Sequence, residues 1–163
     1  MNEVDWQTVY AAQLPRVYNF FRYRVGDGPM AEDLTATTFE KAWRARQRYR
    51  RDVAEFSTWL FTIARNVATD YFRQSRAGLS LDDIRHHADE DSLEEAVQRQ
   101  TDFARLSRLL VRLPAREREL VSLKYGADLT NREIARLTGL SESNVGTILH
   151  RVVQGLKAAW ERS

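Results

Sequence analysis

The chain has 163 residues, a formal net charge of +2, 43% hydrophobic residues and no cysteine. This length gives room for one good core or two small ones, and the missing cysteine excludes disulfides and thiolate metal sites. Lys and Arg outnumber Asp and Glu by 12 to 9 in residues 1–77 and by 11 to 7 in residues 102–163, whereas residues 78–101 hold 2 basic and 7 acidic residues. Two basic blocks thus flank an acidic segment. This distribution favours contact with a polyanion at two separate places.

The apolar residues recur at helical spacing, and Gly and Pro are scarce, so we predict an all-α fold. A first helix should fill the first two dozen residues, and Pro15 should kink it or divide it into two abutting helices. The turn at 26–29 ends with Pro29, which suits the first turn of a second helix reaching about Ala45.

A long third helix is expected after the basic stretch Arg44–Asp52, with Ser57 as its N-cap. Helical periodicity then fails from Gln74 to Ser92, where polar and acidic residues indicate a flexible linker. We therefore expect two small helical domains, residues 1–76 and 93–163, joined by a flexible acidic linker at 77–92.

The second domain should begin with a helix that stops at Pro114, followed by a helix from Pro114 to Tyr125 that ends at Gly126. The stretch Thr130–Arg151 then predicts two short helices joined by a tight turn.

Local signals define both helices of this pair. Thr130 and Glu133 have the spacing of a capping box, Gly139 suits a left-handed helix end, and Ser141 suits a second N-cap. This is the layout of a helix-turn-helix, whose second helix enters the major groove of DNA. The side chains expected to face outward can reach base edges and phosphates; they are Ser143, Asn144, Thr147 and Arg151.

Aromatic and basic residues alternate between Arg44 and Arg73, a composition typical of sites for unpaired nucleic acid, in which bases stack on rings and arginines hold the backbone. The alternative is that the aromatics form core and the arginines are solvated. For Trp59 we favour core; for Tyr49 and the arginines both interpretations stay open.

The sequence carries no glycine-rich phosphate loop, zinc motif or nucleophile elbow, so we expect no enzyme, no catalytic residue, no metal and no cofactor. His86 and His87 fall in the acidic linker, where a solvated segment is favoured over a metal site. The N-terminus does not resemble a signal peptide, and no apolar run reaches membrane-spanning length. We expect a cytoplasmic, nucleoid-associated protein with no membrane insertion.

Three stretches resemble the extracytoplasmic-function (ECF) group of bacterial sigma factors. AEDLTATTFEKAWRA (Ala31–Ala45) is similar to the segment that binds core RNA polymerase. FSTWLFTIARNVATDYFR (Phe56–Arg73) resembles the helix that recognises and melts the minus-ten element. The stretch Leu110–Arg151 resembles the domain that binds the minus-thirty-five element.

The resemblance implies partners and site residues. The partners are promoter DNA and core RNA polymerase, through the clamp helices of its beta-prime subunit and the flap of its beta subunit. Polymerase-binding residues would be Asp33, Leu34, Phe39 and Trp43; for Phe39 and Trp43 a position in the core is the open alternative. Contacts to the melted minus-ten strand would be Tyr49, Arg50, Phe56, Arg65, Asn66 and Arg73. Contacts to the minus-thirty-five duplex would be Arg132, Ser143, Asn144, Thr147 and Arg151.

The chain departs from the family at Gly146, Ile148 and Val153, where basic residues are common. We expect an additional apolar partner surface there, of the kind an anti-sigma factor would use. Two other functions compete with the sigma factor: a helix-turn-helix regulator that never joins polymerase, and a nucleic-acid enzyme. The aromatic and basic segment argues against the first, and the missing catalytic residues argue against the second.

Overall fold

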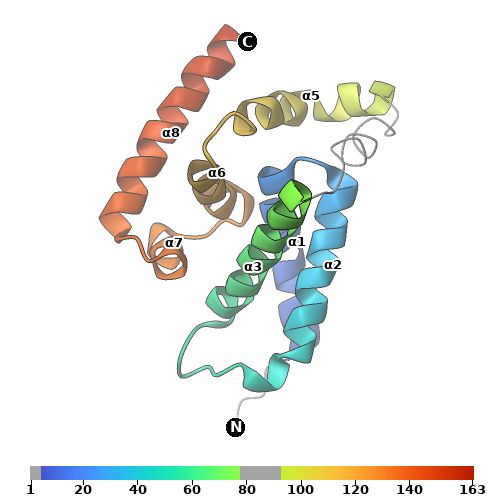
Figure 1. Ribbon diagram of the computed structural model, residues 1–163, viewed down its shortest axis with the longest axis vertical. Helices are drawn as coiled ribbons and strands as arrows, with labels where there is room; N and C mark the ends of the chain where they lie inside the picture. Colours follow the sequence, from blue (N-terminus) through green and yellow to red (C-terminus); the bar gives the residue numbers. More distant parts are fainter. Residues whose placement is uncertain (1–4, 78–92) are drawn as a thin grey trace.

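The computed structural model describes residues 5–77 and 93–163, and every regular element in these ranges is helical (Figure 1). The predicted all-α class is confirmed. The predicted linker at 77–92 lies outside the described residues except for Ala77, and so do His86 and His87.

The first block consists of α1 (Trp6–Val25), α2 (Gly28–Arg44), the short 3-10 turn η1 (Arg46–Arg48) and α3 (Phe56–Ala77). Pro15 lies inside α1, so of the two predicted alternatives, a kink or a division into two abutting helices, the division is wrong. Pro29 stands in the first turn of α2 as predicted. Ser57 is not the N-cap of α3, because the helix already begins at Phe56.

The second block consists of α5 (Leu93–Leu110), α6 (Ala115–Val121), the π-helical turn η2 (Ser122–Gly126), α7 (Asn131–Thr138) and α8 (Glu142–Arg162). Pro114 precedes α6 as its N-cap residue. The predicted helix to Tyr125 is therefore α6 extended by a π turn. Gly126 closes this turn without a positive φ, and Asp128, at φ 58°, makes the left-handed step instead.

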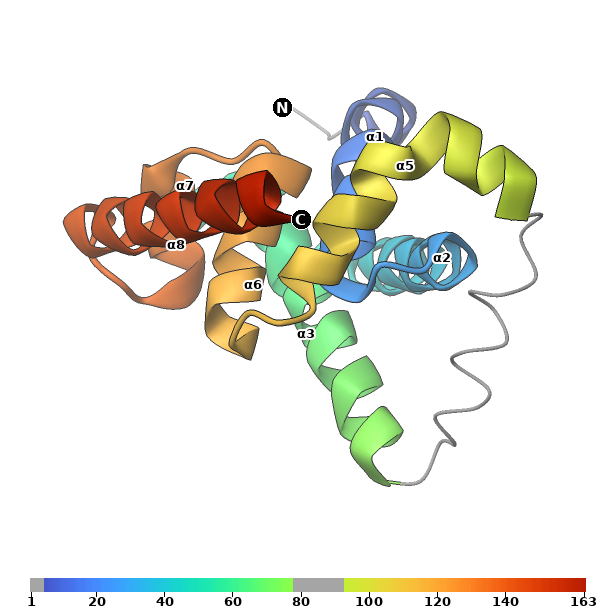
Figure 2. The ribbon, with the colours of Figure 1, turned by 90° about the horizontal axis from the view of Figure 1, so that it is seen from above.

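One apolar core extends through both blocks. Phe20, Phe21 and Phe61 from the first block are fully buried in the same cluster as Leu120 and Leu123 from the second. Helix α1 packs on α2 and also on η2, and in both views α6 lies between α8 and the α1–α3 bundle (Figures 1 and 2). The blocks are thus packed against each other, which determines which predicted contacts remain accessible.

Candidate nucleic-acid interface

Helices α7 and α8 form the predicted helix-turn-helix. The Thr130 hydroxyl accepts from the Glu133 backbone N–H at 3.1 Å, and a Glu133 carboxylate oxygen accepts from the Thr130 N–H at 2.9 Å. Gly139 ends α7 at φ 80°, and Ser141 caps α8 by accepting from the Asn144 N–H at 3.0 Å. The capping box, the left-handed helix end and the second N-cap that the sequence predicted are therefore all present, and they define where α7 ends and α8 begins.

The outer face of this pair carries the predicted duplex contacts. Val145 turns inward and is fully buried, whereas Ser143, Asn144 and Thr147 are exposed. Two exposed arginines complete the face and have only loose carboxylate neighbours: Arg132 lies 3.9 Å from Glu142, and Arg151 lies 3.6 Å from Glu117. Exposed pairs of this kind contribute little, so both arginines can turn to phosphates.

Asn66 is exposed on α3 beside a hollow of about 550 Å³ between α2 and α3. Arg73 stands at its edge and donates to Asp70 at 2.7 Å. The amide can donate to and accept from a base edge, and the arginine is exposed enough to hold a phosphate. Lys41, from α2, gives the hollow a second cation that the sequence reasoning missed.

Tyr49 and Phe56 lie next to each other at the start of α3, in a cluster completed by Trp59 and Trp6. The ring centroids of Tyr49 and Phe56 are 5.5 Å apart, those of Tyr49 and Trp59 are 5.1 Å apart, and the Tyr49 hydroxyl donates to the Ala54 carbonyl at 3.1 Å. Burial raises the pKa of Tyr49. The Tyr49 ring is therefore partly packed against the other aromatic rings. Its neighbour in the sequence, Arg50, is exposed and forms an ion pair with Asp52 at 2.8 Å.

The predicted polymerase contacts separate by burial. Asp33 is exposed and Trp43 is 51% exposed, whereas Leu34 is only 8% exposed and belongs to the core. Leu34 thus packs into the core on the inner face of α2, and this burial does not fit the predicted contact with polymerase. Phe39 is half-buried and, with Trp6, Tyr10 and Trp43, lines an apolar groove of about 350 Å³.

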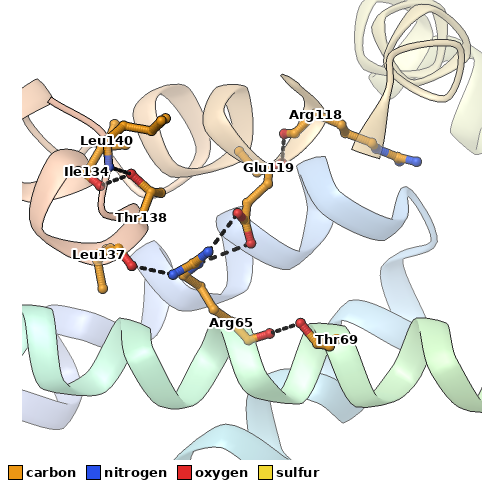
Figure 3. A network of polar contacts seen from close by, with 9 residues as sticks. Arg65, Thr69, Arg118, Glu119, Ile134, Leu137, Thr138 and Leu140 are labelled. Atoms are coloured by element: carbon orange, nitrogen blue, oxygen red, sulfur yellow. Dashed lines mark hydrogen bonds and ion pairs between the residues drawn. The ribbon is translucent and has the colours of Figure 1, made fainter. Parts of the chain in front are cut away.

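Arg65 has a partner that the sequence did not indicate. Its guanidinium donates to both carboxylate oxygens of Glu119, at 3.1 and 3.0 Å, and to the carbonyl of Leu137 (Figure 3). Glu119 lies on α6 and Leu137 on α7, so the second block occupies this side chain. In the described arrangement Arg65 is not available to a phosphate. The spacing of residues within α3 could not predict this contact, because Glu119 is 54 residues away in the sequence.

Among the described residues, no group of three or more His, Cys, Asp or Glu side chains could hold a metal ion. None of the helices in the described ranges is long and apolar enough to cross a membrane.

Known proteins match both blocks. Residues 9–78 match the family model for Sigma-70 region 2, and residues 103–155 match that for Sigma-70, region 4. The ECF RNA polymerase sigma factor RpoE of Cereibacter sphaeroides is 31% identical over 151 residues, covering 93% of this chain and 82% of that protein.

The ECF RNA polymerase sigma factor BldN of Streptomyces coelicolor is 34% identical over 143 residues, which cover 86% of this chain and 54% of BldN. The chain thus spans about half the length of that relative. Among solved structures, the sigma factor RpoE in complex with the anti-sigma factor NepR from Bartonella quintana matches with a TM-score of 0.70 and 21% identity, covering 94% of this chain and 95% of that chain. This likeness is one of fold.

Proposed function

The chain belongs to the ECF RNA polymerase sigma factors, and we propose that its two helical blocks hold a promoter at two separate points. The observation that carries this proposal is the pairing of two exposed polar faces on different elements: the outer face of α7 and α8, and the face of α3 around Asn66. We take residues 1–76 and 93–163 as the two functional units.

The face formed by α7 and α8 binds duplex DNA. Helix α8 enters the major groove at the minus-thirty-five element, where Ser143, Asn144 and Thr147 meet base edges, and Arg132 and Arg151 meet phosphates. The support is their exposure on one face of a well-capped pair of helices.

The face of α3 around Asn66 binds the melted minus-ten strand. Asn66 reads the edge of an unstacked base, Arg73 holds the strand's backbone, and the ring cluster that includes Tyr49 and Phe56 provides an apolar stacking surface at the start of α3. The hollow next to Asn66 supports this assignment because it has room for a base and is lined by both polar and apolar groups. Arg65 joins this contact only when it is released from Glu119.

Core RNA polymerase binds the surface of α2. Asp33 and the exposed Trp43 provide polar and aromatic contacts for the clamp helices, and Phe39 lines the groove between Trp43 and α1. The flap of the beta subunit binds the second block. A protein that binds promoters on the chromosome would act in the cytoplasm, at the nucleoid, and we propose this location.

An anti-sigma factor or similar regulator is the third partner. Val153 is half-buried and, with Leu106, Leu156 and Trp160, lines an apolar hollow of about 280 Å³ between α5 and α8. Val152, by contrast, is 4% exposed and packs into the chain's own core. The partner surface therefore centres on Val153.

Single-round transcription with purified core polymerase and a promoter library tests the whole proposal. We expect a defined subset of promoters to yield run-off RNA only when the chain is added. A chain that binds duplex promoter fragments but neither binds core polymerase nor supports a transcript would be a stand-alone helix-turn-helix regulator.

A further inference from the structure

Gly146 lies in the second turn of α8, near the end of that helix that joins α7 (Figure 1). It is one of the three positions at which the chain departs from its family. A Cβ atom at this position would lie 3.5 Å from Nδ2 of Asn131, which is an ordinary van der Waals distance, and the φ of Gly146 is not positive. Neither crowding nor backbone strain within the described ranges therefore requires a glycine here.

The glycine alone does not identify a site. Gly155, in the same helix, is exposed, and no described atom lies within 4 Å of its missing Cβ, so the fold does not require that glycine either. Glycine is a poor helix former, and both positions weaken α8 relative to alanine. Gly146 differs from Gly155 in its surroundings: it lies in sequence between the exposed Asn144 and Thr147, and it has the side chain of Asn131 beside it.

The Asn131 side chain is held beside Gly146 with unused hydrogen-bonding capacity. Its Nδ2 atom is the group nearest to the missing Cβ of Gly146, and its Oδ1 atom is buried with no hydrogen-bond partner in the part of the chain that the structure describes. Buried polar side-chain atoms are usually paired, so an unpaired one needs an explanation. Packing holds the oxygen inward and leaves the N–H groups on the Gly146 side, where a molecule bound to α8 can meet them.

We propose that Gly146 and Asn131 together form one contact to DNA. The missing side chain lets a DNA strand approach the surface of α8, and Nδ2 of Asn131 donates to a phosphate oxygen of that strand. This inference rests on the proposed function, because it takes α8 to lie in the major groove. It adds a DNA contact that comes from α7 and carries no charge.

A phosphate is the expected acceptor because of where Asn131 lies. In a helix-turn-helix the second helix presents side chains to base edges, whereas the first helix crosses the sugar–phosphate backbone, and asparagine side chains donate to phosphates. Arg132, the next residue along α7, is exposed and lies 3.9 Å from Glu142, one turn before Gly146 on α8. This arginine offsets the repulsion between the Glu142 carboxylate and a phosphate that approaches Asn131.

Alanine at Gly146 should separate stability from DNA binding. In the full chain, Gly146→Ala should raise the melting temperature by about 1–4 °C, because alanine is the better helix former and its Cβ makes no close contact. With core polymerase, the same variant should lose about fivefold in affinity for a duplex selected from a random library by the unaltered chain and polymerase, since the methyl group holds the strand away from the amide. Gly155→Ala is the matched control: it should raise the melting temperature equally and leave the affinity unchanged.

Asn131→Ala should weaken the same complex about fivefold, and the salt dependence of binding identifies the kind of contact. The amide is neutral, so we expect no change in the slope of log K against log salt concentration. Adding Gly146→Arg to Asn131→Ala should restore affinity at low salt and steepen that slope by about 0.9, because the new guanidinium neutralises one phosphate. Ethylation of the contacted phosphate should weaken binding by the unaltered chain but not by Asn131→Ala.

Unchanged affinity in both Gly146→Ala and Asn131→Ala would overturn this contact, and so would ethylation effects that are identical in the unaltered chain and Asn131→Ala. Thr147→Ala and Arg151→Ala report separately on the proposed function. If these two weaken binding whereas the variants at Gly146 and Asn131 do not, α8 binds DNA without Asn131 and only this contact fails. If all four leave the affinity unchanged, α8 does not enter the groove and the proposed function fails with it. Circular dichroism checks that each variant stays helical.

Discussion

Arg65 and Glu119 lie 54 residues apart in the sequence and form a bidentate ion pair in which the side chains are 27% and 14% exposed. The guanidinium also binds the Leu137 carbonyl, so three acceptor atoms from two helices surround it. One side chain of α3 therefore links the first block to both α6 and α7. Its environment is that of an interface residue and not of a free surface cation.

Arg65→Lys should be a costly substitution although it conserves charge. Lysine presents a single ammonium group and cannot reproduce the fork, so we expect a loss of about 1–2 kcal/mol in the free energy of unfolding. The matched control is Arg73→Lys on the same helix, where an exposed pair with Asp70 should change stability by less than about 0.5 kcal/mol. Urea denaturation measures both, and equal losses would contradict the interface role of Arg65.

Replacing each of two glycines by alanine should change the stability of the fold in opposite directions. Gly139 has φ 80°, and a Cβ there would meet nothing within 4 Å, so Gly139→Ala should cost about 1–2 kcal/mol through backbone strain alone. Gly155 lies inside α8 with equally open space, and Gly155→Ala should stabilise by about 0.5–1 kcal/mol because alanine is the better helix former. Thermal unfolding distinguishes the two signs, and a stabilised Gly139→Ala would count against the left-handed helix end.

Local chemistry made the helix-turn-helix predictable. The capping box, Gly139 and Ser141 act within a few residues of one another, so their spacing alone was informative. Leu34 could also have been assigned to the core from spacing, since it shares a helical face with the buried Ala31 and Thr38.

Contacts between distant segments could not be read in this way. Ser57 has the chemistry of an N-cap, yet it donates to Glu133 across 76 residues, and Arg65 has the chemistry of a phosphate contact, yet it meets Glu119. Hydrogen-bonding capacity is visible in a sequence, whereas the partner that uses it depends on how the blocks pack.

Val152 and Val153 are neighbours that should tolerate charge very differently. Val152→Glu would place a carboxylate in the core, where no partner compensates for desolvation, and should remove several kcal/mol of stability. Val153→Glu would place it at the edge of the hollow between α5 and α8 and should cost less than about 1 kcal/mol. Melting temperatures test this contrast, and a Val153→Glu variant as unstable as Val152→Glu would mean that Val153 is not free to meet a partner.

Asn66→Ala should impair promoter opening more than the first binding of duplex DNA. The alanine removes both hydrogen-bonding groups that the amide offers to an unpaired base, a loss of about 1–3 kcal/mol, or roughly fivefold or more in the population of open complex. Permanganate reactivity of unpaired thymines reports opening, and gel mobility of the polymerase complex on duplex DNA reports the earlier step. Gln74→Ala, at another exposed position of α3, should alter neither. An equal decrease in both measurements for Asn66→Ala would assign the residue to general phosphate contact or to folding, because only a group that reads a melted base acts after the strands separate.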